Sequence, residues 1–167
     1  MAHRRTAEHL VRVRFELDPF DWHGHASESL WAVPVPQTEW RDFRIMNSPF
    51  FARGISHLDV VRALPVERDA VFDFEDVIER GGHSTYMLIV PIFEARERAY
   101  WSMLEKLGCS YESATINLRT ESNLLLSVDV PRAANIHDVY EILERGESDA
   151  VWMFQEGYAH LNPASAE

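Results

Sequence analysis

The most constraining feature of the sequence is the alternation in VRVRFEL, residues 11–17. Apolar and charged side chains take turns along it, with Val11, Val13 and Phe15 on one side. A period of two residues is typical of a β-strand with one buried face and differs from the 3.6-residue period of an amphipathic helix. The chain must therefore bury this apolar face against further strands or helices.

Further short strands are predicted before residue 80. The segments SLWAVPV (29–35) and VFDFEDVIE (71–79) also alternate, and Phe43 and Ile45 mark another short strand. Gly, Pro, Asp and Asn lie between these segments. This part of the sequence shows no helical period. Five or six short strands joined by turns predict a strand-rich roll or small barrel for residues 1–82.

The second half has a different pattern. STYMLIV (84–90) is almost continuously apolar, as expected of a central strand. Helical spacing occurs in residues 94–107 and again between Asn135, the predicted N-cap, and Gly146, the predicted end. The order strand, helix, strand, strand, helix, strand predicts a ferredoxin-like (βαββαβ) subdomain over 83–167, with a frayed tail. The predicted fold class is α+β, with the roll or barrel packed on this ferredoxin-like subdomain.

Charge restricts the partners of the protein. The 167 residues are 46% hydrophobic, enough for a packed core, and carry a formal net charge of −11. An acidic surface repels phosphates, so we expect no nucleic acid, whereas a basic protein partner would be attracted. Asp138, Glu141 and Glu144 of the second predicted helix are the candidate docking residues. Solubility alone also favours acidic surfaces, and the sequence leaves both explanations open.

Composition also indicates the compartment. The longest apolar run is far below the roughly 20 residues of a membrane helix, so no membrane association is expected. The N-terminal segment lacks the apolar stretch of a signal peptide, and the single cysteine, Cys109, cannot form an internal disulfide. We expect a cytoplasmic, bacterial-type protein with Cys109 as a small buried residue. The sequence does not determine the oligomeric state.

Several short motifs resemble those of a known family. They are Leu30-Trp31-Ala32, Asn47 with Pro49-Phe50, Gly54-Ile55-Ser56, Asp59-Val60-Val61, Gly82-His83-Ser84-Thr85 and Leu107-Gly108-Cys109. In this combination the chain is similar to the domain of unknown function 4265. Where the family's pattern has a glycine before the aspartate, this chain has Leu58. The resemblance implies a shared architecture and no established activity.

The densest group of candidate binding residues lies in NSPFFARGISHLDVVRA, residues 47–63. Gly54 admits a backbone angle that other residues avoid, and the two adjacent phenylalanines point to opposite sides if the chain is extended. This pattern is typical of a structural corner and also of a binding edge built from Phe51, Arg53 and His57. An arginine beside an aromatic ring would anchor an anionic or planar group.

Two histidine-containing fragments suggest chemistry without establishing it. GGHST, residues 81–85, offers His83 as a base but lacks the frames of a nucleophile elbow and of a phosphate loop. The structural alternative is that His83 bonds a loop carbonyl at the start of a strand. His23-Gly24-His25 supplies two imidazoles but not the four ligands of a structural zinc site. We assign no catalytic residue, metal or cofactor from the sequence.

The sequence leaves three functional hypotheses. The first is a non-enzymatic binding protein whose acidic face docks a basic protein partner, as an antitoxin, immunity protein or regulator does. The second is a small-ligand sensor that uses the cleft between the subdomains, with Phe51, Arg53 and His83. The third is a hydrolase centred on His83.

Overall fold

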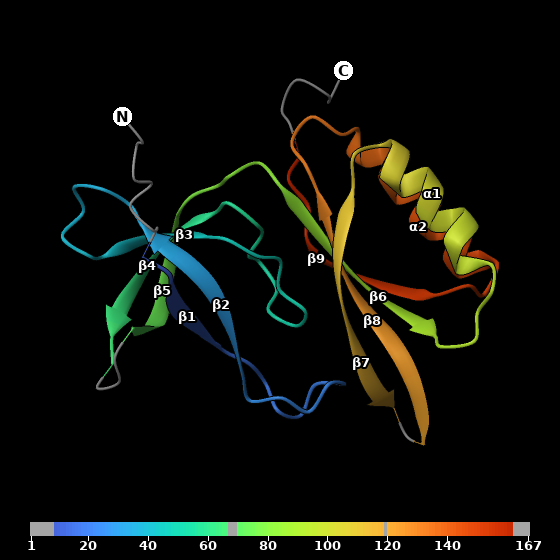
Figure 1. Ribbon diagram of the computed structural model, residues 1–167, viewed down its shortest axis with the longest axis horizontal. Helices are drawn as coiled ribbons and strands as arrows, with labels where there is room; N and C mark the ends of the chain where they lie inside the picture. The colour runs from blue at the N-terminus through green and yellow to red at the C-terminus, as the bar shows by residue number, and fades with distance from the viewer. Residues whose placement is uncertain (1–8, 67–69, 119, 162–167) are drawn as a thin grey trace, which may run out of the picture.

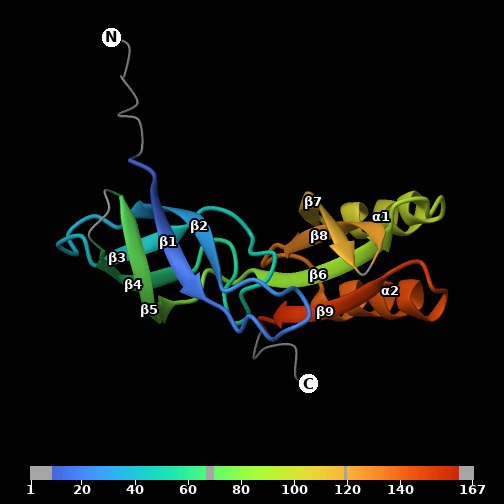
Figure 2. The same cartoon turned by 90° about the horizontal axis from the view of Figure 1, so that it is seen from below.

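The computed structural model describes residues 9–66, 70–118 and 120–161 (Figure 1). A five-stranded barrel and a four-stranded sheet lie side by side, and two helices cover the face of the sheet that is turned away from the barrel (Figures 1 and 2). None of the described helices has the length and apolar composition needed to cross a membrane. The tail that the sequence predicts to fray, residues 162–167, lies outside the described residues.

The barrel contains β1 (Val11–Glu16), β2 (Ser27–Pro34), β3 (Asp42–Ile45), β4 (Val60–Pro65) and β5 (Val71–Glu79). Consecutive strands pair antiparallel, and β1 closes the barrel by pairing with β5 in parallel. The predicted alternation in β1 is confirmed, because Val11, Val13 and Phe15 are at most 3% exposed while the residues between them face solvent. These side chains form the barrel core together with Leu30, Ala32, Phe43, Ile45 and Val61.

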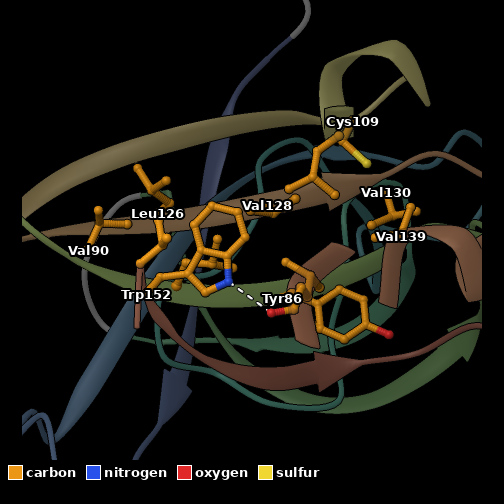
Figure 3. Close-up of a cluster of buried hydrophobic side chains, with 12 residues drawn as sticks. Tyr86, Val90, Cys109, Leu126, Val128, Val130, Val139 and Trp152 are labelled. Carbon is orange, nitrogen blue, oxygen red and sulfur yellow. Dashed lines mark hydrogen bonds between the residues drawn. The ribbon is translucent and has the colours of Figure 1, made fainter. Parts of the chain in front are cut away.

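The second sheet contains β6 (Ser84–Pro91), β7 (Ser110–Leu118), β8 (Glu121–Val130) and β9 (Met153–Tyr158). Its strand order is β7-β8-β6-β9, and all pairs are antiparallel. Helices α1 (Glu97–Lys106) and α2 (Ile136–Ser148) pack on one face. The core between the sheet and the helices includes Tyr86, Val90, Leu126, Val128, Val139 and Trp152 (Figure 3).

The predicted fold class, α+β with a ferredoxin-like second subdomain, is wrong. The described part of the chain is mostly β, with 44% strand, a closed five-stranded barrel and a second sheet, and the two helices found there have only 10 and 13 residues. Helical periodicity located both helices, but the order of elements does not reveal what covers the other face of a sheet. Here the barrel covers part of that face, so the second sheet forms a layer between barrel and helices rather than a helical subdomain of its own.

Helix α2 begins where the sequence predicts and ends later. Asn135 Oδ1 accepts hydrogen bonds from the backbone N–H groups of His137 and Asp138 at 3.0 and 3.3 Å, which confirms the predicted N-cap. The helix continues past Gly146, the predicted end, because this glycine is a buried packing position against the Trp152 indole. The glycine allows close approach of the indole and does not mark the stop.

We expect Gly146→Ala to destabilise the protein, although alanine is more favourable than glycine in a helix interior by about 1 kcal/mol. An added Cβ would overlap Cε2 of the Trp152 indole, and such overpacking costs about 1–3 kcal/mol. Urea unfolding of Gly146→Ala checks this, with the exposed Ser148→Ala as the control on the same helix. A variant as stable as the wild-type protein would show that the indole can move aside at little cost.

Candidate functional site

The barrel meets the second sheet through the β3–β4 loop, residues 46–59. Ser56 Oγ lies 2.7 Å from Thr85 Oγ1, and Ser127 Oγ donates a hydrogen bond to the Pro49 carbonyl oxygen. All three hydroxyl-bearing side chains are buried. These contacts fix the loop on the sheet face opposite the helices, so that side chains from both halves of the chain meet there. We call this region the junction.

A glutamate of the barrel holds the first part of the β3–β4 loop. The Glu28 carboxylate accepts hydrogen bonds from the backbone N–H groups of Phe50, Phe51 and Ala52 at 2.6 to 2.9 Å. Hydrogen bonds from N–H groups to a carboxylate are about twice as strong as those between neutral groups. The stretch 47–63 is therefore a structural corner in this part.

His57 and His83, two of the predicted binding residues, come together at the junction on either side of Asp129. His83 Nδ1 lies 2.8 Å from Asp129 Oδ1, and His57 Nδ1 lies 3.4 Å from Asp129 Oδ2. The two imidazole centroids are 5.1 Å apart, edge to face. Among the described residues, His83 Nδ1 therefore contacts a carboxylate instead of the loop carbonyl that the structural alternative supposes.

The sequence analysis missed Asp129. Its neighbours Val128 and Val130 point into the helix-covered core, so the alternation places Asp129 on the opposite face, where a polar residue is usually in contact with solvent. The side chain is only 15% exposed, because the barrel covers this end of the face. The available signal was an acid in the mostly apolar second half of β8, residues 124–130.

A groove of about 840 Å³ opens on the same sheet face, toward the β7–β8 turn. Its floor follows from the strand register, since Ile89 of β6 lies beside Met153 of β9, and Met87 lies beside Gln155. Trp22, from the β1–β2 loop at residues 17–26, forms one wall and donates a hydrogen bond from Nε1 to Gln155 Oε1 at 3.2 Å. The groove thus lies between a barrel loop and the second sheet. No short motif in the sequence predicts a binding site from these residues.

Phe51 and Arg53 contact the β1–β2 loop instead of the histidine cluster. The Phe51 ring lies 4.7 Å from the His23 ring and 4.6 Å from the His25 ring, and Arg53 Nη2 lies 3.3 Å from Asp21 Oδ2. Partial burial lowers the pKa of His23, so the neutral ring is favoured in this aromatic stack. Among the described contacts, Phe51 and Arg53 therefore do not share a site with His57 and His83.

Comparison of the sequence with models of protein families identifies the family to which the chain belongs. The model of the domain of unknown function (DUF4265) matches residues 28–154. The chain belongs to the DUF4265 family. This confirms the resemblance seen in the sequence motifs.

One solved structure resembles the DUF4265 chain over nearly its whole length. It is described as "Novel crystal structure of a hypothetical protein from Neisseria gonorrhoeae", with a TM-score of 0.66 and 21% identity over 93% of this chain and 97% of that chain. The two proteins share a fold. No curated protein matches the chain.

Leu58, in the turn before Asp59, has an unusual backbone angle, with a φ of +70°. This left-handed region costs roughly 1–2 kcal/mol for a residue with a Cβ atom. The turn is closed by a hydrogen bond from the Asp59 N–H group to the Ser56 carbonyl oxygen at 3.2 Å.

The acidic candidates lie elsewhere in the DUF4265 structure. Asp138, Glu141 and Glu144 are exposed on α2, whereas Val139 and Leu143 of the same helix are buried. Glu141 is 3.5 Å from a helix arginine, so part of its charge is balanced locally. Docking of a basic protein partner on this face stays a prediction.

Cys109 has the character expected from the sequence. It is 5% exposed, and burial raises the pKa of its thiol to about 12. A thiol with so high a pKa is almost entirely protonated at neutral pH and is a poor nucleophile. The prediction of a small buried residue is confirmed.

Proposed function

We propose that this DUF4265 protein is a non-enzymatic binding protein that holds a small apolar molecule in the groove between the β1–β2 loop and the second sheet. The proposal keeps the location of the second sequence-based hypothesis, a cleft between the two halves, but replaces its residues. The observation that carries it is the apolar floor of the groove, where Ile89 is half-buried and Met153 is exposed, beside the buried Met87.

The floor is apolar where a solvent-facing strand is usually polar. Met153 is 59% exposed although it lies beside the central strand β6. A ligand that removed the exposed parts of Ile89 and Met153 from water would gain about 25 cal/mol for each Å² of apolar surface buried. Unbranched thioethers also adapt to ligands of different shape. The volume of the groove lies within the roughly 300–1,000 Å³ range of small-molecule sites.

The rim of the groove indicates how a ligand would be oriented. Glu121 is the charged residue among those that line the groove, and Asn123 lies near it at the start of β8. The Gln155 side chain already accepts the hydrogen bond from Trp22. A ligand with an apolar body and one hydrogen-bond donor or cationic end would therefore place that end toward Glu121.

Binding of the neutral dye N-phenyl-1-naphthylamine tests the proposal. We expect saturable binding to the wild-type protein, and Met153→Glu should weaken it about tenfold or more, because a charge in an apolar site is costly. Met153 is largely exposed, so this change should leave the fold intact, which circular dichroism checks.

The matched control is Ile92→Glu. Ile92 is another exposed apolar residue, at 43%, and it lies outside the lining of the groove. It should leave dye affinity unchanged. Equal losses for the two variants, or no saturable binding by the wild-type protein, would contradict the groove as a ligand site.

A further inference from the structure

We propose that His57, His83 and Asp129 form a binding site for a divalent transition-metal ion of the zinc type, separate from the groove. Each residue offers one ligand atom, and the three atoms lie within 4.8 Å of one another. Two imidazole nitrogens and one carboxylate are donors that suit Zn²⁺ and its neighbours. Ca²⁺ and Mg²⁺ prefer oxygen donors and fit this set poorly.

Two of the ligand distances, from the two oxygens of the Asp129 carboxylate to the two histidines, are close to those of a metal site. Ligand atoms bound at about 2.0–2.1 Å to a tetrahedral zinc ion are about 3.3–3.4 Å from one another. The two distances from Asp129 oxygens to the histidine Nδ1 atoms are 2.8 and 3.4 Å. Small side-chain rotations would therefore let an ion replace the present hydrogen bonds.

The three ligands come from three segments that are held together at Thr85 of β6. His57 follows Ser56, whose hydroxyl bonds Thr85, and Asp129 pairs with Thr85 across the β6–β8 ladder. His83 directly precedes β6. Ligands held by the backbone in this way lose little conformational entropy on binding an ion. All three side chains are at most 28% exposed, which lowers the local dielectric and strengthens their attraction for a cation.

A second observation supports binding of an ion with a water ligand at this cluster. A cavity of about 130 Å³ adjoins it, and His57, Asp129 and Ser48 are among the lining residues. Ser48 Oγ is buried and has no hydrogen-bond partner among the described residues. Three protein ligands leave a fourth position for water on a zinc ion. Ser48 lines the cavity where it could hydrogen-bond such a water, and this would satisfy its hydroxyl group.

The alternative is that the cluster is only a hydrogen-bonded link between the barrel and the sheet. Calorimetric titration of the full chain with Zn²⁺ separates the two. We expect one ion per chain, and His83→Ala, His57→Ala or Asp129→Asn should each weaken binding about 100-fold or more, since each removes a direct ligand. Zn²⁺ should also raise the melting temperature of the wild-type protein and not that of these variants.

The control is His25→Ala, which removes an imidazole from the His23–His25 pair. Among the described residues, this pair is not part of a group of three ligand atoms. His25→Ala should leave Zn²⁺ affinity unchanged. The proposal is overturned if the wild-type protein does not bind Zn²⁺, or if His25→Ala weakens binding as much as His83→Ala. Asp129→Asn preserves the shape of the side chain, so a folded variant is available even if the alanine variants unfold.

Discussion

Asp59→Ala should lower the free energy of unfolding by about 3–5 kcal/mol, the range for a buried charge pair that loses one partner. Asp59 is fully buried. Its carboxylate accepts hydrogen bonds from the N–H groups of Ser56 and Gly81 at 3.0 and 2.9 Å and from Arg80 Nη1 at 3.1 Å. Alanine at position 59 would leave the two N–H groups and the Arg80 guanidinium without the carboxylate that accepts their hydrogen bonds.

Arg80 makes the loss larger, because it has little freedom to find another carboxylate. Its Nη1 also donates a hydrogen bond to the Gly54 carbonyl oxygen at 2.6 Å, and its guanidinium lies 3.8 Å from the centre of the Tyr158 ring. The β3–β4 loop and the end of β9 are thus tied to the same charge. Asp59→Ala should therefore loosen the contact between the barrel and the second sheet.

Urea unfolding followed by circular dichroism measures the effect. The matched control is Asp73→Ala, because Asp73 pairs with Arg14 at 2.8 Å on the surface, with side chains 44% and 48% exposed. Such an exposed pair contributes about 0–1 kcal/mol. Asp59→Asn keeps the shape and one acceptor oxygen, so it should fall between the two. Equal losses for Asp59→Ala and Asp73→Ala would refute a central role for this carboxylate.

Leu143→Ala should cost about 2–5 kcal/mol, as large-to-small changes in a core do. Leu143 is fully buried between α2 and the second sheet. Its carbonyl oxygen accepts a hydrogen bond from Trp152 Nε1 at 3.0 Å, which holds the indole in the same core (Figure 3). This backbone bond fixes Trp152, so the core has limited freedom to collapse into the cavity.

The same urea experiment tests Leu143→Ala, with Leu161→Ala as the control. Leu161 is 66% exposed, so its truncation should change stability little. A cost below about 1 kcal/mol for Leu143→Ala would mean that the site repacks around the missing atoms. The melting temperature should fall in parallel.

The sequence by itself determined features whose cause is local. Alternation in residues 11–16 places one face of β1 in the core, and the side chain of Asn135 caps α2 through N–H groups two and three residues ahead. Both depend only on the geometry of a strand or a helix end, so a short window of residues contains the information. The family motifs could likewise be recognised without a structure.

Only the tertiary structure decided which side chains from distant segments are in contact. His83 and Asp129 are 46 positions apart and meet because the register of β6 with β8, together with the β3–β4 loop, places them there. Trp22 reaches Gln155 across the groove from 133 positions away. Gly146 has the sequence pattern of a helix end, but in the structure it is a packing position against Trp152. Such contacts depend on register and on the packing of one sheet on another, and residue patterns along a single element do not encode which partner covers its second face.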